Sequence, residues 1–127
     1  MSDNSKFFIC KHCGNIVDLI EDKGTPVACC GENMTKLEPN TVEASSEKHL
    51  PSITTLGDSI SVQVGSVPHP MVDEHHIAFV YVQTQHGGQC KYLKAGGEPK
   101  LTFSFSDDKP TAVYAYCNLH GLWKTEI

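Results

Sequence analysis

The chain has 127 residues, a mass of 13.9 kDa and a formal net charge of −5. All ten basic residues are lysines. The chain thus has no arginine, whose guanidinium group is the usual means of binding phosphate and guanine. We therefore expect no nucleic-acid partner. No apolar run approaches the roughly 20 residues of a membrane span. The segment from Met1 to Lys6 is polar and lacks the basic region followed by an apolar region that marks a secretory signal. We therefore expect a cytoplasmic protein with no membrane partner.

Residues 1–38 form the first expected unit, which holds four of the six cysteines and few large apolar side chains. Residues 16–20 are typical of a short strand, and Lys23-Gly24 indicates a turn leading to a second short strand that ends at Cys29. The pattern predicts a hairpin whose ends carry sulfur. So small a unit has too little core to fold without a metal.

Residues 39–46 read as a linker, and residues 47–127 as an antiparallel β-sandwich. The sandwich is predicted from period-2 alternation at 60–64 and 101–105, from a run at 77–82 that is apolar on both faces like a central strand, and from a further strand at 112–117. Turns are expected at Gly57-Asp58, Gly87-Gly88, Gly96-Gly97 and Asp107-Asp108.

The first candidate metal site consists of Cys10, Cys13, Cys29 and Cys30. Cys10-Lys-His-Cys13-Gly is a metal-binding knuckle, and four thiolates suit tetrahedral zinc or iron, between which ligand type alone does not decide. A reducing compartment disfavours the alternative, a pair of disulfides. Adjacent side chains of a strand point to opposite faces, so the chain must bend at Cys29-Cys30. We expect His12 to be an exposed loop residue, because four sulfurs complete the shell.

A second candidate metal site draws on residues spread over the rest of the chain. Cys117-Asn-Leu-His120 places a thiolate and an imidazole three residues apart, and Pro68-His69-Pro70 holds an imidazole in a stiff loop. His49, and either His75 or His76, bring the set to four imidazoles and one thiolate. Five ligands exceed a typical zinc shell and would leave an octahedral iron one open position. We expect Cys90 to be a small buried strand residue and His86 an exposed loop residue.

Five motifs occur in order along nearly the whole chain, and together they resemble desulfoferrodoxin, the two-iron superoxide reductase family. They are Cys10-x-x-Cys13-Gly-Asn, Cys29-Cys30-Gly-Glu, Glu47-Lys48-His49-x-Pro51, Gly65-Ser-Val-Pro-His69-Pro-Met and Cys117-Asn-Leu-His120-Gly-x-Trp123-Lys124.

The resemblance implies a mainly β protein: a small desulforedoxin-like or rubredoxin-like N-terminal domain, followed by an immunoglobulin-like sandwich. It implies two mononuclear non-haem irons per chain, Fe(III) at the four cysteines and a catalytic iron cycling between Fe(II) and Fe(III). The family's ligands to the catalytic iron fall on His49, His69, His75, His120 and Cys117. Family members often have an aromatic residue after the third histidine, where this chain has His76.

The resemblance also implies the reaction, which is reduction of superoxide to hydrogen peroxide by one electron and two protons. It places Glu47 and Lys48 beside the open iron position, with Glu47 as a ligand of the oxidised iron. A local ammonium attracts anionic superoxide where the net charge of the protein does not. Members are usually homodimers and take electrons from rubredoxin-like donors.

Two other functions are open to test. A rubredoxin-type electron-transfer protein without catalysis of its own needs only the four cysteines, and a zinc-binding adaptor needs only a structural site. Neither explains the histidine-rich part of the chain. The resemblance leaves open whether the four-cysteine iron passes electrons on or only holds its small domain together.

Overall fold

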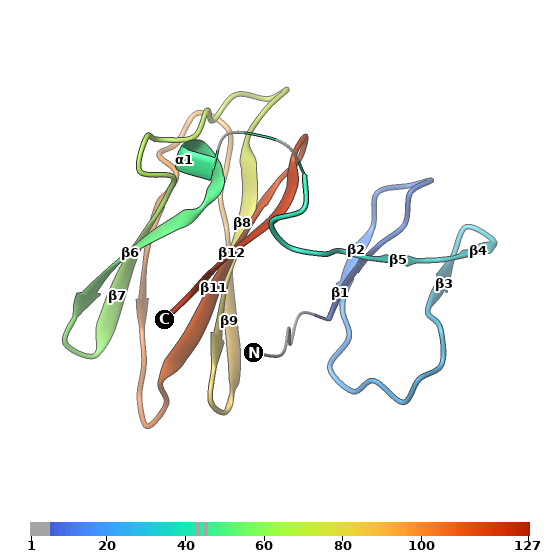
Figure 1. The fold of residues 1–127 in the computed structure, drawn as a ribbon, viewed down its shortest axis with the longest axis horizontal. Coiled ribbons are helices and arrows are strands. Elements are labelled where there is room, and N and C mark those ends of the chain that lie inside the picture. Colours follow the sequence, from blue (N-terminus) through green and yellow to red (C-terminus); the bar gives the residue numbers. More distant parts are fainter. Residues whose placement is uncertain (1–5, 43, 45) are drawn as a thin grey trace. The chain divides into compact units, whose positions relative to one another are not determined.

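The computed structural model describes residues 6–42, 44 and 46–127. The chain divides into two compact units, Met1–Glu38 and Pro39–Ile127 (Figure 1). In the described part of the chain, no helix is long and apolar enough to cross a membrane.

The first unit consists of short antiparallel strands. A three-stranded sheet has the order β2-β1-β5, and a separate two-stranded hairpin pairs β3 with β4. The strands are β1 (Phe7–Ile9), β2 (Ile16–Asp18), β3 (Ala28–Cys29), β4 (Glu32–Asn33) and β5 (Thr35–Lys36). In the described part of this unit, Phe7 and Cys10 are the only buried hydrophobic residues, which agrees with the expected lack of core.

The predicted hairpin between residues 16–20 and the strand ending at Cys29 is wrong. Val17 of β2 pairs with Phe8 of β1, while Cys29 pairs with Glu32 across a tight turn. The apolar segment Phe7–Ile9, for which no strand was predicted, is the partner of β2. Residues 21–26 are exposed and end in a proline, which has no N–H to donate to a ladder.

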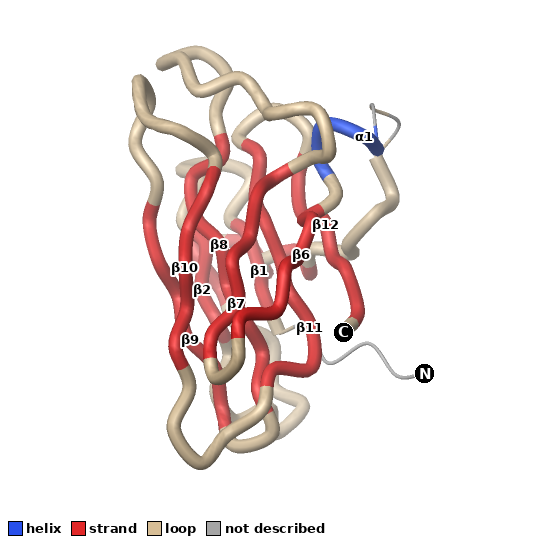
Figure 2. The backbone as a smooth tube through the Cα atoms, turned by 90° about the vertical axis from the view of Figure 1, so that its left-hand side faces the viewer, coloured by secondary structure: helices blue, strands red, loops and turns tan. Residues whose placement is uncertain are grey.

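The second unit is a sandwich of two antiparallel sheets, as predicted (Figures 1 and 2). One sheet has the order β10-β7-β6 and the other β12-β11-β8-β9. The elements are α1 (Ser46–His49), β6 (Pro51–Leu56), β7 (Ser59–Val64), β8 (Ile77–Thr84), β9 (Gly87–Tyr92), β10 (Lys100–Ser104), β11 (Pro110–Cys117) and β12 (Gly121–Glu126).

The core of the sandwich lies between the two sheets. Alternate residues of β7 are buried, and β8 is an interior strand, as its two apolar faces predicted. The buried cluster that joins the sheets comprises Ile60, Val62, Val64, Met71, Ile77, Val80, Val82, Phe103, Val113, Ala115 and Cys117. Because Cys117 is the last residue of β11, the core reaches up to the second candidate metal site.

Side chains close both edges of the sandwich. Gln89 and Lys91 of β9 donate to the carbonyl oxygens of Ser104 and Thr102 in β10, at 2.9 and 2.6 Å. On the opposite edge, Thr125 Oγ1 donates to the Pro51 carbonyl at 2.7 Å. The connecting loops are therefore left at the two ends of the sandwich, and α1 lies at one of them (Figure 1).

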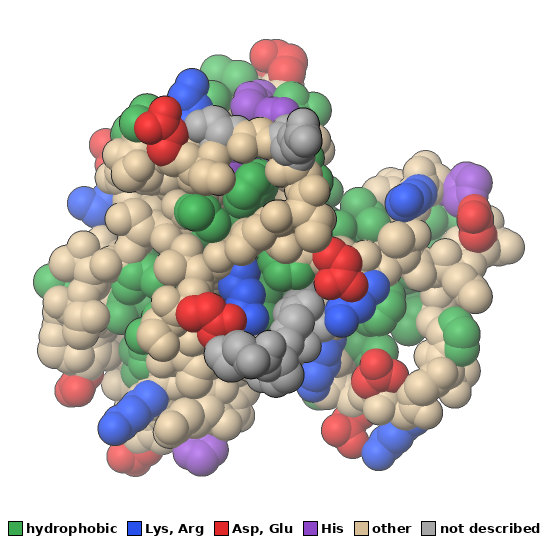
Figure 3. Space-filling model, viewed as in Figure 1, with side chains coloured by type: hydrophobic (Ala, Val, Ile, Leu, Met, Phe, Trp, Pro, Cys, Tyr) green, Lys and Arg blue, Asp and Glu red, His purple; other side chains and the backbone are tan. Residues whose placement is uncertain are grey.

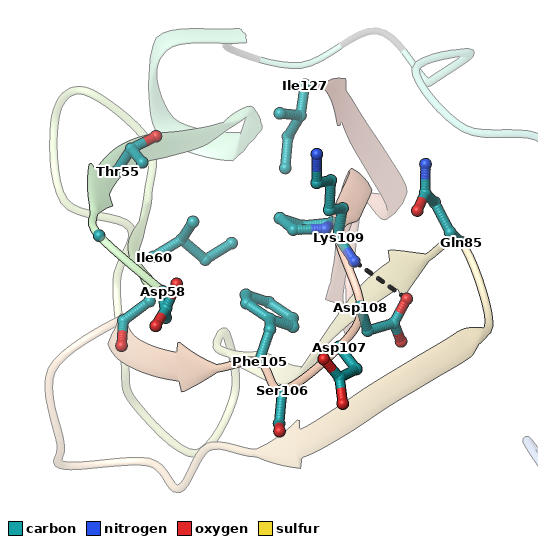
Figure 4. Close-up of a pocket in the computed structure, with 13 residues that line it drawn as sticks. Thr55, Asp58, Ile60, Gln85, Phe105, Ser106, Asp107, Asp108, Lys109 and Ile127 are labelled. Atoms are coloured by element: carbon teal, nitrogen blue, oxygen red, sulfur yellow. Dashed lines mark hydrogen bonds between the residues drawn. The ribbon is translucent and has the colours of Figure 1, made fainter.

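The end away from α1 contains a cavity of about 790 Å³ (Figure 4). Ile60 and Phe105 lie at its apolar part, and Asp107, Asp108 and Lys109 line its polar side. No cysteine or histidine lines this cavity, so it is separate from both candidate metal sites.

Two local expectations for the sandwich need correction. Gly87-Gly88 was predicted as a turn, but both residues open β9 and the turn lies at Gln85-His86. Cys90 was expected to be buried, but it is exposed, because it lies on the side of edge strand β9 that faces away from the core. His86 is exposed, as predicted.

Candidate metal centres

The four cysteines of the first unit converge at one point. Their sulfur atoms all lie within 4.8 Å of one another, and Cys29 Sγ is 3.7 Å from Cys13 Sγ and 3.9 Å from Cys30 Sγ. Four sulfurs about 2.3 Å from a tetrahedral ion would be about 3.8 Å apart. The observed separations therefore fit a single bound ion of this kind.

The expected bend at the paired cysteines is confirmed. Cys30 has φ of 54° and the following Gly31 has φ of 76°, which is the left-handed region that a non-glycine residue rarely adopts. This turn, which closes the β3–β4 hairpin, brings two adjacent side chains to the same side. The strain of Cys30 is consistent with a functional constraint on its sulfur.

The thiols of this cluster differ strongly in acidity. The N–H of Cys13 hydrogen-bonds to the sulfur of Cys10 and is the main reason that the Cys10 pKa falls to about 6. Hydrogen bonds to the neighbouring Cys10 and Cys13 sulfurs raise the pKa of Cys30 to about 12. Four thiolates this close repel one another, and a cation is the natural compensation.

His12 is exposed, as predicted, but it has a specific partner. Its Nε2 contacts the carboxylate of Glu32. This pair links the turn between Cys10 and Cys13 to the strand that follows Cys30. No role was predicted for Glu32, although it follows the second cysteine pair within the motif Cys29-Cys30-Gly-Glu.

The second cluster gathers side chains from four segments at the α1 end of the sandwich. His49 ends α1, His69 lies in the loop after β7, His75 lies in the loop before β8, and Cys117 ends β11. The donor atoms of these four residues all lie within 4.8 Å of one another. His120 joins them from the turn between β11 and β12, with its Nδ1 3.8 Å from Cys117 Sγ.

The spacing of the imidazole nitrogens fits ligands of one ion. His49 Nε2 lies 3.1 Å from His69 Nε2 and 3.1 Å from His120 Nδ1. Ligands at about 2.1 Å from an ion and 90° apart would be separated by about 3.0 Å. His75 Nε2 is buried and has no hydrogen-bond partner in the described part of the chain. Such an orphaned nitrogen is costly unless it coordinates a metal.

Burial favours the neutral form, which metal ligands require, for two of the imidazoles, His69 and His75. Burial lowers the pKa of His69 to about 4, and burial is also the main reason that the His75 pKa is lowered. His69 Nδ1 lies 2.7 Å from the Pro70 carbonyl oxygen. Because Nδ1–H donates to this oxygen, Nε2 is left as the free lone pair.

Cys117 is completely buried, and burial raises the pKa of its thiol. The backbone N–H groups of Leu119 and His120 act in the opposite direction, because they hydrogen-bond to the sulfur and stabilise its thiolate. The turn after β11 therefore provides both an imidazole and two hydrogen bonds to the sulfur.

Trp123 contacts two of the histidines and helps to hold them in place. Its ring stacks on His49 at a centroid distance of 5.0 Å and an angle of 25°, and its Nε1–H donates to the His120 carbonyl at 3.1 Å. Trp123 is buried. Trp123 belongs to the motif that begins at Cys117, but no role was predicted for it.

Asn118 joins the turn that follows Cys117 to the loop that carries His75. Its Oδ1 accepts a hydrogen bond from the His76 N–H at 2.8 Å, and its Nδ2 donates to the Glu74 carbonyl at 3.0 Å. His76 itself turns away from the donors, with Nδ1 3.1 Å from the Val72 carbonyl oxygen. The structure thus brings His75, and not His76, to the cluster.

Glu47 and Lys48 are exposed residues of α1, directly before the buried His49. The positive charge of Lys48 is one of the causes that lower the pKa of His75, so its ammonium acts on the cluster. Histidine side chains reach the surface at this end of the second unit, beside basic, acidic and hydrophobic side chains (Figure 3).

Comparison with protein families gives two matches that together cover almost the whole chain. Residues 41–126 match the desulfoferrodoxin model, and residues 2–37 match the model of the desulfoferrodoxin N-terminal domain.

Individual proteins agree with these matches. A desulfoferrodoxin from Clostridium acetobutylicum is 39% identical over 127 residues, which is the full length of both chains. The crystal structure of the superoxide reductase from Treponema pallidum superposes with a TM-score of 0.82 at 37% identity, covering 98% of this chain and 100% of that one. A superoxide reductase from Pyrococcus horikoshii is 36% identical over 99 residues, covering 64% of this chain and 86% of its own.

Proposed function

Because the chain belongs to the desulfoferrodoxin family, we propose that it is a superoxide reductase. Superoxide takes up one electron and two protons and leaves as hydrogen peroxide, and no oxygen is released. The observation that carries the proposal is the convergence of four imidazoles and the Cys117 thiol at the α1 end of the sandwich.

The donor set fits a mononuclear iron held by His49, His69, His75, His120 and Cys117. When bound, iron supplies the electron by passing from Fe(II) to Fe(III). The neutral imidazoles hold it without adding negative charge, and the thiolate donates electron density from the core side. A second iron, as Fe(III), is held by Cys10, Cys13, Cys29 and Cys30.

Lys48 attracts the substrate. Superoxide is an anion and the chain carries a net charge of −5, so the global field does not favour its approach. An exposed ammonium one residue before His49 creates a local positive potential at the cluster. The same ammonium orients water that supplies protons to the product.

Glu47 is the second residue proposed to act from α1. Its exposed carboxylate lies on the same short helix as Lys48, and we assign it as a reversible ligand of the oxidised iron. In that role its carboxylate would help the four imidazoles and the Cys117 thiolate to hold the iron in its oxidised state.

The proposal has three further parts, which concern the whole protein. The chain is divided into a four-cysteine domain at 1–38, a linker at 39–46 and a catalytic domain at 47–127. The electron donor is a small rubredoxin-like protein. The protein acts in the cytoplasm as a homodimer.

Metal analysis combined with a visible spectrum tests the assignment of the two sites. Purified protein should contain two irons per chain and be coloured by thiolate-to-iron charge transfer, and it should consume superoxide from a pulsed source. A colourless preparation with one zinc per chain would exclude both the reductase and a rubredoxin-type carrier. Two irons without superoxide consumption would favour the carrier.

A further inference from the structure

Gly65 lies where no side chain fits. It is buried in the turn after β7 and has φ of +85°. A Cβ built on Gly65 would lie 2.4 Å from the Val67 carbonyl oxygen and 2.7 Å from the carbonyl oxygens of both Glu47 and Lys48. The backbone of α1 therefore packs directly on the backbone of this turn.

The same turn hydrogen-bonds on both sides of Lys48, to Glu47 in α1 and to Leu50, which directly follows the helix. The Val67 N–H donates to the Glu47 carbonyl at 3.0 Å, and the Gly65 N–H donates to the Leu50 carbonyl at 2.9 Å. Ser66 Oγ donates to the Glu47 carbonyl at 3.3 Å. These bonds occupy carbonyl groups at the end of α1 that have no partner within the helix.

A helix of four residues has no stability of its own, so its position depends on what it packs against. The turn that holds α1 is itself closed by a hydrogen bond from the His69 N–H to the Val64 carbonyl at 3.2 Å. One compact turn therefore carries the ligand His69 and also supports the residues that precede the ligand His49.

We propose that Gly65 is a positioning residue for superoxide capture, because its missing side chain lets α1 pack directly on the turn after β7 and so keeps Lys48 beside the imidazole cluster. This inference rests on the proposed function. A side chain at position 65 would push the backbone of Glu47 and Lys48 outward and move the ammonium away from the approaching anion. His49 at the end of α1 is buried and stacked on Trp123, so we expect this donor to keep its place among the other four.

Gly57 offers a matched control. It lies in the turn between β6 and β7 with φ of +64°, but a Cβ there would meet nothing within 4 Å. Gly57→Ala and Gly65→Ala thus carry similar backbone strain, and only the second produces a clash with α1.

The test uses iron-loaded full-length protein with Gly65→Ala, Gly57→Ala, Lys48→Ala and the double variant Gly65→Ala/Lys48→Ala. The rate constant with pulse-generated superoxide is measured at several ionic strengths. We expect Gly65→Ala to lower it by roughly tenfold and to weaken its salt dependence, as loss of local steering requires. Gly57→Ala should do neither, and Gly65→Ala should have little further effect once Lys48 is absent.

Hydrogen exchange provides a readout that does not depend on activity. Peptides covering residues 46–50 and 65–69 should exchange faster in Gly65→Ala, while iron content and the visible spectrum stay at wild-type values. Ser66→Ala, which removes only one hydrogen bond to the Glu47 carbonyl, provides a milder variant with the same direction of change should Gly65→Ala not fold.

Three results would overturn the inference. They are equal rates for the two glycine variants, an undiminished effect of Gly65→Ala in the Lys48→Ala background, and loss of the catalytic iron in Gly65→Ala. A wild-type protein that does not react with superoxide would instead reject the proposed function, while hydrogen exchange would still report on the packing of α1.

Discussion

The side chains of the second cluster are oriented by neighbouring residues that are not themselves metal donors. The Pro70 carbonyl selects the tautomer of His69, and Trp123 stacks on His49 while holding the His120 backbone. Supporting interactions of this kind fix the direction of a ligand and tune the metal it binds. Lys48 has a different role, because it acts on the substrate through its positive charge.

Replacing Lys48 by alanine should lower the rate constant with superoxide by roughly tenfold and leave both irons bound. The physical reason is the loss of the positive charge beside His75. Lys100→Ala is the control, because it removes the same charge from an exposed position on β10. Equal rate constants for the two variants would reject the local role of Lys48.

At the scale of elements, the donors of the second cluster lie at strand ends and in the loops between them. A single side chain, Asn118, fastens the turn after β11 to the loop before β8 with two hydrogen bonds. The rigid sandwich therefore sets the separation of Cys117 and His75 only with the help of this amide.

Asn118→Ala should accelerate the release of the catalytic iron to a chelator and leave the four-cysteine iron unaffected. Each lost hydrogen bond is worth about 0.5–1.5 kcal/mol, so an increase of several-fold is expected. Gln89→Ala removes a hydrogen bond between β9 and β10 and serves as the control. The role of Asn118 would be rejected if both variants released iron at the wild-type rate.

The loop between β10 and β11 should give the sandwich a measurable acid dependence. Thr84 Oγ1 donates to Asp108 at 2.6 Å, and this bond, with the N–H groups of His86 and Lys109, lowers the Asp108 pKa below its usual 3.8. A lowered pKa stabilises the folded state above the unfolded pKa, and this contribution disappears as pH falls through the folded value.

Asp108→Asn should therefore lower the urea midpoint relative to wild type at pH 5–7, and the difference should shrink below about pH 4. Asp107→Asn makes the same charge change one residue earlier and provides the control. A difference that stays constant from pH 7 to pH 2 would show that the carboxylate of Asp108 is not the cause.

The strands that could be predicted from the sequence are those with a recognisable pattern of apolar and polar residues. Alternation identified β7 and β10, and a two-faced apolar run identified β8. The pairing of β2 with β1 was not predictable from local turn residues, because it depends on which of several apolar segments packs best beside β2. Likewise, spacing brought Cys117 and His120 together, but only the folded loops bring His49 and His69 to them. Asn118 and Gly65 were overlooked because backbone contacts leave no mark in composition.

At the scale of the whole molecule, the two metal sites belong to different compact units. The four-cysteine site lies in a unit with little core, so its metal should contribute to folding. The five-donor site lies at the end of a sandwich that has a core of its own.

His120→Ala should therefore remove the catalytic iron and spare the four-cysteine iron. Metal analysis and the visible spectrum of the variant check this expectation, with Cys13→Ser as the reciprocal variant that should lose only the first iron. Loss of both irons from His120→Ala would mean that the two sites depend on each other.

The stoichiometry of the products tests the central claim most directly. Reduced protein is mixed with a known amount of superoxide, and hydrogen peroxide and oxygen are both measured. A superoxide reductase yields one hydrogen peroxide for each superoxide consumed and releases no oxygen. Release of oxygen, with only half as much hydrogen peroxide, would identify dismutation and contradict the proposed reaction.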